Sequence, residues 1–431
     1  MRAAGTGLTG QETLSAGRGP SGSCDPRRQW CRRRNSTGCM AEEKLKTFRR
    51  YDMEEKKLGF GFMRLPLLNE NDQTSIDYPQ LIRMTDSFMA QGFTYFDTAY
   101  MYHDFISEKV VNEVVVKRYP RDSFTIASKM PTMLLNGAED QVRIFAEQLQ
   151  KTGAAYFDYY LLHDLNVVNY AVAKKYDTIA FLQQKKAEGY IRCLGFSFHD
   201  SAEVLEQILS EHPEFDFVQL QINYLDWDSE GIQSRKCYET ARKYGKDIIV
   251  MEPVKGGTLA HLPEEAAALL QREHPDWSAA SWAIRFAAGL PGVTMVLSGM
   301  SSMEQLLDNT SVMRDFMPLS QSERDTLFLA RDSINSSIAI PCTSCRYCVE
   351  GGSCPQNIAI PNYFSLYNAE QQDKNTLWSP QKEYYMNLAG QGYGKASSCI
   401  ECRQCEDACP QHIHIIDWLK QVAGTFETED T

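Results

Sequence analysis

Short apolar segments alternate with longer amphipathic segments over residues 55–316 of the chain. The short segments combine β-branched, aliphatic and aromatic residues over lengths typical of strands. The longer segments repeat their apolar residues at helical spacing, and many of them end beside a glycine that can cap a helix. This alternation is typical of repeated βα units, in which the strands run parallel in one sheet.

The pattern predicts eight strands and eight helices in this stretch. The strands are 57–65, 95–99, 124–130, 157–163, 193–198, 217–224, 247–254 and 294–300. The helices are 78–91, 108–119, 139–152, 178–188, 202–211, 233–244, 277–288 and 303–316. This α/β pattern fits a (β/α)8 TIM barrel better than an open doubly wound sheet. No G-x-G-x-x-G follows a strand, so a Rossmann dinucleotide site is not supported.

The composition is that of an ordinary globular protein. The 431 residues include 44 Lys and Arg against 56 Asp and Glu, a net charge of -12, and 43% of them are hydrophobic. The chain is too apolar to be disordered, and the acidic balance leaves no chain-wide basic surface for nucleic acid. No apolar run approaches the roughly 20 residues that a membrane helix needs, so we expect no membrane span.

Residues 1–39 differ from the rest of the chain because they show neither a helical nor a strand periodicity. They are rich in Gly, Ser, Thr and Arg, with seven arginines against Glu12 and Asp25. This composition predicts a disordered segment, and a transit peptide has similar features. Because Met40 is followed at once by Ala41-Glu42-Glu43-Lys44, we favour a misassigned start or an added leader.

Four polar residues interrupt apolar runs where the barrel strands end. Asp97, Lys129 and His163 end the second, third and fourth strands, and Tyr102 follows Asp97 by five residues. Barrel enzymes place their chemistry at these carboxyl ends. Taken singly, each residue has a simpler explanation: a helix cap, a solvated lysine, a satisfied core histidine or rim packing.

Together these residues resemble the aldo/keto reductase family. The resemblance covers roughly residues 45–316, and its motifs occur in the family's order. They are Leu58-Gly59-Phe60-Gly61, Phe96 to Tyr102 with Ser107-Glu108, Ser128-Lys129, Asp158 to His163, Leu194-Gly195-Phe196-Ser197, Val218-Gln219, and Ser298 to Asn309. The resemblance implies a catalytic tetrad in which Tyr102 is the acid/base, supported by Asp97, Lys129 and His163.

The implied roles are physically coherent. A carbonyl that accepts hydride develops negative charge on its oxygen, and a nearby proton donor stabilises that charge. The ammonium of Lys129 favours phenolate, so we expect it to lower the pKa of Tyr102, with Asp97 keeping Lys129 charged. His163 would hydrogen-bond the substrate oxygen and position it.

The resemblance also implies a bound nicotinamide dinucleotide, NADH or NADPH. Ser197 and Gln219 match residues that bind the carboxamide, whereas Ser301, Ser302 and Asn309 lie in the segment that holds the adenosine end. The serines and the asparagine could instead be turn and cap residues.

Three positions depart from the family. His103 follows the tyrosine where Gly is frequent, Phe198 stands where Asn is frequent, and Gly299 and Gln305 replace cations near the 2'-phosphate. Without those cations the usual partners of a 2'-phosphate are absent, so the choice between NAD and NADP stays open.

The C-terminal region is defined by its cysteines. Eight of the chain's 13 cysteines lie between residues 342 and 409, in runs of three at intervals of two, each followed by a distant Cys-Pro. The second run is the C-x2-C-x2-C-x3-C-P signature of 4Fe-4S clusters, and the first has two extra residues before its last cysteine. The region resembles two-cluster ferredoxin domains, in which the fourth cysteine of each run ligates the other cluster. That rule predicts two ligand sets: Cys342, Cys345, Cys348 and Cys409 for one cluster, and Cys399, Cys402, Cys405 and Cys354 for the other.

Zinc and disulfides explain these cysteines less well. A zinc site typically uses pairs of C-x2-C, so a third cysteine at the same interval is surplus. Disulfides need an oxidising compartment, and a chain with a large core does not need them. Cys193 and Cys237 fit buried small hydrophobic residues.

We expect three parts: a disordered leader 1–39, a barrel 40–320, and a mostly helical ferredoxin-like iron–sulfur domain 321–431. The leading hypothesis is a cytoplasmic oxidoreductase that interconverts a small carbonyl and an alcohol with NAD(P)H. Two 4Fe-4S clusters would serve electron transfer, with a redox protein such as ferredoxin as a candidate partner. The alternative is a redox-responsive regulatory or binding protein whose clusters are structural or sensory. A third hypothesis is a ferredoxin-coupled reductase that does not use nicotinamide.

Overall fold

The computed structural model describes residues 56–228, 232–335, 339–350, 353–372, 380–390 and 392–427. The expected leader, residues 1–39, lies outside these described residues.

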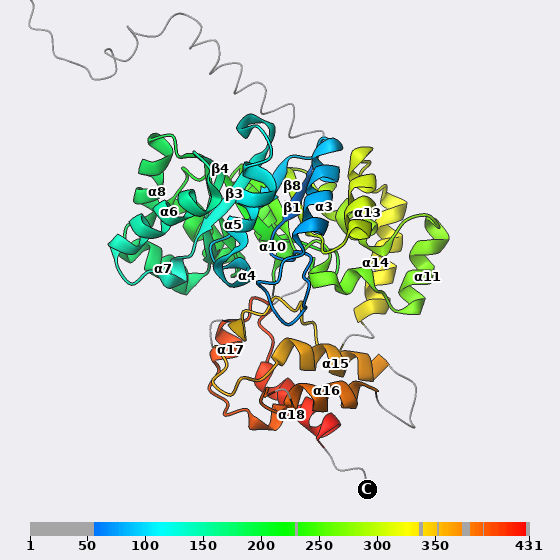
Figure 1. Ribbon diagram of the computed structural model, residues 1–431. Helices are drawn as coiled ribbons and strands as arrows, with labels where there is room; N and C mark the ends of the chain where they lie inside the picture. The colour runs from blue at the N-terminus through cyan, green and yellow to red at the C-terminus, as the bar shows by residue number, and fades with distance from the viewer. Residues whose placement is uncertain are drawn as a thin grey trace, which may run out of the picture. The chain divides into compact units, whose positions relative to one another are not determined.

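Eight parallel strands close into a barrel in sequence order, and helices surround them (Figure 1). The strands are β1 (Leu58–Gly61), β2 (Tyr95–Asp97), β3 (Thr125–Met130), β4 (Phe157–Leu165), β5 (Ile191–Phe198), β6 (Phe217–Gln221), β7 (Asp247–Met251) and β8 (Val293–Gly299). The barrel closes where β1 pairs with β8, with Leu58 opposite Val296 and Gly61 opposite Gly299. The predicted (β/α)8 barrel is therefore confirmed.

Several strands end earlier than the apolar pattern predicted. The segments 57–65 and 217–224 shrink to β1 and β6, because the apolar residues beyond these strands lie in loops. Phe62, Ile222 and Tyr224 in those loops are fully buried. A buried loop side chain and a buried strand side chain give the same sequence signal, so the pattern overran the strand ends.

The helices that surround the barrel match most of the predicted segments. They are α3 (Tyr78–Ala90), α4 (Tyr102–Phe105), α5 (Ser107–Val111), α6 (Ala138–Thr152), α7 (Val167–Lys175), α8 (Thr178–Ala187), α9 (Ala202–Glu211), α10 (Ser234–Lys243), α11 (Glu264–Glu273), α12 (Ala279–Ala288), α13 (Met303–Arg314) and α14 (Gln321–Asn335). The predicted helix 108–119 is divided between α5 and a π-helical turn, Asn112–Val116. The helices α4, α7 and α11 were not predicted. In α7 the apolar Val167 and Val168 point to solvent, which breaks the amphipathic period.

Side chains from the strands form a separate hydrophobic cluster. This inner cluster consists of Tyr95, Ala127, Leu161, Phe217, Ile249, Met295 and Leu297. Gly195 makes room for it, because a Cβ on Gly195 would lie 2.4 Å from the carbonyl oxygen of Phe217. The barrel is thus closed by packing through its middle, and space for a ligand is left at the carboxyl ends of the strands.

The cysteine-rich region is mostly helical, as predicted, and has a hydrophobic core of its own. Its helices are α15 (Ile360–Gln372), α16 (Pro380–Gly390), α17 (Gln404–Asp407) and α18 (Ile415–Phe426). The preceding helix α14 belongs to the barrel, since Leu327, Ala330 and Ile334 join the barrel's core. We therefore propose a boundary after α14 instead of at residues 320 and 321. None of the described helices is long and apolar enough to cross a membrane.

Candidate active site and cysteine cavities

A buried ion pair lies at the carboxyl ends of β2 and β3. Lys129 Nζ is 2.5 Å from Asp97 Oδ1 and donates to the carbonyl oxygen of Thr98 at 2.9 Å. Burial acts to lower the pKa of Lys129, but the charges of Asp97 and Tyr102 outweigh it, so that pKa lies above its usual range. Lys129 is therefore a fixed positive charge beside the cavity described below.

Tyr102 is half-buried directly beside this pair. Lys129 Nζ lies 4.8 Å from the centre of the Tyr102 ring, and the His163 ring meets it edge-on at 5.7 Å. Burial raises the pKa of Tyr102 above its usual range, while Lys129 acts to lower it. The expected lowering by Lys129 is present, but burial is the larger effect, so the expected net lowering is corrected. Tyr102 is accordingly a protonated phenol near neutral pH.

His163 completes the group from β4. Burial, together with the charge of Lys129, holds its pKa well below the usual range, so the imidazole is neutral. Its Nδ1 atom is buried, and no residue in the described part of the chain hydrogen-bonds to it. The structure therefore brings the four predicted tetrad residues together, in the protonation states that proton donation requires.

The backbone after Tyr102 takes a left-handed conformation that usually favours glycine, although the residue there is His103. His103, Asp104 and Phe105 all have positive φ values, at 51°, 49° and 69°. Two hydrogen bonds hold His103 there: its Nε2 accepts from the Leu65 amide at 3.3 Å, and its Nδ1 lies 2.9 Å from the carbonyl oxygen of Gln73. The strained left-handed turn is thus fixed by the imidazole, and it positions Tyr102.

A cavity of about 1040 Å³ opens in front of the tetrad. It lies at the carboxyl ends of the strands and includes Tyr102 and Asp97 in its lining. Residues of the cysteine-rich region complete the wall: Thr343, Cys345, Tyr347, Pro410 and Gln411. Its volume is at the upper end of the range for ligand pockets, so it has room for an extended cofactor and a small substrate.

The residues expected at the nicotinamide cofactor divide into two groups. Gln219, Ser301, Ser302 and Asn309 line the cavity. Ser197 is buried behind it, where its Oγ accepts a hydrogen bond from the Asp164 amide at 2.8 Å. Ser302 also has the capping role that the sequence allowed. It immediately precedes α13, and its hydroxyl accepts a hydrogen bond from the Gln305 amide at 3.3 Å.

The cysteines surround two smaller cavities. Cys342, Cys345, Cys348 and Cys409 line one of them. Cys354, Cys399, Cys402 and Cys405 line the other. Each run thus contributes its three close cysteines to one cavity and its distant cysteine to the other. Ten cysteines lie in the described part of the chain, and all ten are free thiols.

The two cysteine loops share one backbone conformation. Ser344 and Arg346 flank Cys345 with φ values of 54° and 70°, and Glu401 and Arg403 flank Cys402 with 55° and 66°. Within the described residues no three His, Cys, Asp or Glu side chains converge as ligands of a single metal ion. The thiols instead ring a cavity, which is the arrangement that a multi-iron cluster requires, so the residues fit 4Fe-4S clusters.

Comparison with known families identifies both regions. The aldo/keto reductase family model matches residues 57–327, more than half of the chain. This chain belongs to the aldo/keto reductase family. A 4Fe-4S dicluster domain model matches residues 341–414. The protein is thus an aldo/keto reductase-family oxidoreductase with an iron–sulfur domain, and carbonyl compounds are the substrates of that family.

Solved aldo/keto reductases share the barrel. The holo form of an enzyme from Bacillus halodurans is 22% identical, with a TM-score of 0.51 over 64% of this chain and 91% of that one. An enzyme from Klebsiella pneumoniae in complex with NADPH is 21% identical, with a TM-score of 0.51 over 63% of this chain and 89% of that one. These likenesses establish the fold, and no curated protein sequence matches the chain.

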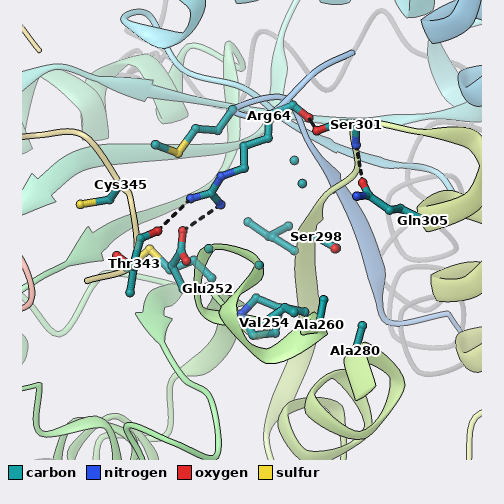
Figure 2. A pocket seen from close by; sticks show the side chains of 18 of the residues that line it. Arg64, Glu252, Val254, Ala260, Ala280, Ser298, Ser301, Gln305, Thr343 and Cys345 are labelled. Atoms are coloured by element: carbon teal, nitrogen blue, oxygen red, sulfur yellow. Dashed lines mark hydrogen bonds and ion pairs between the residues drawn. The ribbon is translucent and has the colours of Figure 1, made fainter. Parts of the chain in front are cut away.

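Arg64 is a cavity residue of this aldo/keto reductase that the sequence analysis missed (Figure 2). Its guanidinium lies 3.2 Å from Glu252 Oε1 and 3.5 Å from the carbonyl oxygen of Thr343. A Cβ on Gly299 would lie 3.1 Å from the Cβ of Arg64, so the aliphatic part of Arg64 packs beside Gly299 while its charged end points toward Glu252 and Thr343. The available signal was a cation three residues after β1, at the same barrel end as the tetrad.

Proposed function

We propose that this protein interconverts a carbonyl compound and an alcohol, using NADH or NADPH bound in the large cavity. The observation that carries the proposal is the buried Lys129–Asp97 pair, 2.5 Å apart, beside a protonated Tyr102 at the cavity wall. A buried charge pair is costly to form, and structural needs alone do not explain its position beneath a cavity.

The tetrad residues divide the proton chemistry among them. A bound nicotinamide supplies or accepts hydride. Tyr102 donates its phenolic proton to the carbonyl oxygen, and Lys129 stabilises the phenolate that remains. Asp97 holds the ammonium in place. The neutral His163 donates a hydrogen bond to the same oxygen and fixes the carbonyl against Tyr102.

The cavity residues suggest how the dinucleotide is held. Gln219 faces the tetrad, with its Nε2 3.5 Å from Asp97 Oδ2, which suits an amide that orients the carboxamide. Ser301, Ser302 and Asn309 would hold the adenosine end, and Ser197 would support the carboxamide from behind Gln219. Arg64 adds a positive charge for phosphate groups, although Glu252 already neutralises part of it.

The two cysteine cavities are proposed to hold one 4Fe-4S cluster each, with the ligand sets given above. Burial raises the pKa of Cys342 to about 11 and that of Cys345 to about 12. These thiols would therefore ionise only when iron binds. Bound clusters supply one-electron transfer, so we propose a redox protein such as ferredoxin as partner and the cytoplasm, which keeps thiols reduced, as location.

The decisive experiment combines cofactor analysis with one substitution. Anaerobic iron and sulfide content, a visible spectrum and titration with NADH and NADPH establish both cofactor classes. Tyr102→Phe should lower kcat for aldehyde reduction by about 10² to 10⁴-fold. Tyr100→Phe is the matched control, because the Tyr100 hydroxyl donates to Glu147 at 2.6 Å on the outside of the barrel. Absence of nicotinamide binding, or an unchanged rate in Tyr102→Phe, would overturn the proposal.

A redox-responsive role is the second candidate, because Cys345 lines both its own cavity and the large one. Turnover measured with the clusters oxidised, reduced and removed separates the two. Rates that do not depend on cluster state exclude the redox-responsive role, whereas nicotinamide binding without turnover in any state favours it.

A further inference from the structure

The cysteine loop that contains Cys342, Cys345 and Cys348 forms part of the large cavity. Thr343, Cys345 and Tyr347 of this loop line the cavity together with Tyr102. The residues between cluster-binding cysteines therefore border the same space as the proposed proton donor.

Two contacts fix this loop against the barrel, and a third fixes the segment that contains Cys409, which lines the same cysteine cavity. Arg64 donates to the carbonyl oxygen of Thr343, and Gly256 approaches the same oxygen so closely that a Cβ there would lie 1.9 Å from it. Gln411, two residues after Cys409, donates from its buried Nε2 to Gln221 Oε1 at 2.9 Å. The loop is thus held by residues that follow β1 and β7, and the neighbouring Cys409 segment is held at the end of β6, which leaves the loop little freedom relative to the cavity.

Tyr347 extends from this loop toward the catalytic residues. Its ring meets the ring of His199 edge-on at 6.3 Å. Burial raises its pKa well above the usual range, and the nearby Tyr102, Asp164 and Cys345 add to the effect. No hydrogen bond between described residues engages the Tyr347 hydroxyl. Packing therefore places the Tyr347 side chain, and its hydroxyl remains available for a ligand.

The second cysteine loop shows that the cluster site itself does not require a tyrosine here. The two loops have the same spacing and the same pattern of positive φ values. The residue equivalent to Tyr347 is Gln404, between Cys402 and Cys405, and it is exposed. The tyrosine of the first loop is thus explained by the cavity it faces.

We propose that Tyr347 is a specificity-determining residue, forming the wall of the substrate pocket opposite Tyr102 against which planar, aromatic carbonyl compounds pack. The inference rests on the proposed carbonyl–alcohol function and extends it. The iron–sulfur region then selects the substrate through this side chain, whatever part its clusters take in electron transfer. Tyr102, His199 and Tyr347 all line the cavity, and aromatic rings pack well against one another.

The test replaces Tyr347 by the residue that the other loop tolerates. Tyr347→Gln is compared with wild type and with Gln404→Ala, an exposed control in the equivalent loop. Each holoenzyme is assayed with benzaldehyde and with 4-tert-butylbenzaldehyde. We expect the kcat/KM ratio of the bulky to the small aldehyde to rise at least tenfold in Tyr347→Gln, mainly through KM. Gln404→Ala should leave it unchanged, and iron content should stay equal in all three.

A binding measurement keeps the test independent of turnover. Isothermal titration measures the Kd of benzoate and of 2-naphthoate, which differ in the size of their ring systems. The ratio of their Kd values should shift at least tenfold toward 2-naphthoate in Tyr347→Gln, with the Kd of NADPH within twofold of wild type. Ratios unchanged within twofold, or a wild type that binds neither carboxylate, overturn the proposal. If wild type reduces no aldehyde but the ratio of the two carboxylate Kd values still shifts in Tyr347→Gln, the proposed function is wrong and the role of Tyr347 in shaping the pocket is supported.

Discussion

Two buried lysine–aspartate pairs of the barrel have almost the same geometry and different surroundings. Lys129–Asp97 and Lys255–Asp226 each measure 2.5 Å, and both lysines are 1% exposed. The first pair lies beside Tyr102 at the cavity. The second is enclosed by amides that accept or donate hydrogen bonds. A short, buried ion pair therefore does not by itself identify a catalytic centre, and what lies next to the pair decides its role.

The second pair belongs to the attachment of the cysteine-rich region. Asp226 Oδ2 accepts from Asn223 at 2.9 Å and from Gln221 at 3.3 Å, and Gln221 in turn accepts from Gln411. This buried chain of polar groups connects the loops after β6 and β7 to the segment after Cys409. Because Lys255–Asp226 is part of this hydrogen-bonded chain, we assign it a structural function. The following variants distinguish this structural pair from the catalytic pair Lys129–Asp97.

The largest difference should appear in Lys129→Met. We expect kcat to fall about 10² to 10⁴-fold, because Tyr102 loses the charge that stabilises its phenolate. Stability should fall by about 3–5 kcal/mol, since Asp97 is left buried without a partner. Steady-state kinetics and urea unfolding measure the two effects. A rate within threefold of wild type would contradict the catalytic assignment of this pair.

Lys255→Met should cost about the same stability, 3–5 kcal/mol, because Asp226 is left equally uncompensated. Its effect on kcat should be far smaller than that of Lys129→Met, since Lys255 does not border the cavity. The double variant Lys255→Met/Asp226→Leu should recover most of the stability, which urea unfolding can measure. Loss of kcat equal to that of Lys129→Met would erase the distinction.

Gly256→Ala tests the attachment from the backbone side. Gly256 and Gly245 both have a φ of 65°. A Cβ added to Gly245 would meet no atom within 4 Å, whereas a Cβ added to Gly256 would meet the Thr343 carbonyl oxygen. Both alanine variants should lose about 1–2 kcal/mol from the left-handed conformation. Gly256→Ala should lose about 1–3 kcal/mol more through overpacking, with a weaker Kd for NADPH. If the two variants lose the same stability, the loop that contains Thr343 moves aside without cost and does not fix the attachment.

The smallest effect concerns acid stability and comes from His163, which lies beside the first pair. His163 has a depressed pKa when folded, so the unfolded chain binds its proton first as the pH falls below about 6.5. Stability should therefore decrease below that pH, by up to about 1.4 kcal/mol per pH unit. His163→Leu should flatten this slope in urea unfolding at pH 7 and 5.5. The same slope in both proteins would refute a neutral, buried His163.

Much of the barrel and its tetrad could be predicted from sequence, because alternating segments specify βα units and place Asp97, Lys129 and His163 at consecutive strand ends. The cysteine spacings likewise predicted which thiols share a cavity, and the assignment of their clusters stays a prediction. The sequence could not show Arg64 beside Gly299, since these residues meet only when β1 closes against β8. Nor could it show that burial outweighs Lys129 in setting the pKa of Tyr102, because burial depends on the assembled walls.

The exchange of distant cysteines between the two cavities has a consequence for maturation. Cys409 lines the first cavity and Cys354 lines the second, so the second set of four thiols is complete only when the chain has been synthesised through residue 405, and the first only through residue 409. Iron loading of either cavity should consequently begin only after nearly all of the cysteine-rich region has been synthesised. A nascent chain that stops at residue 398 contains the whole barrel, yet it holds only three thiols of the first set and one of the second.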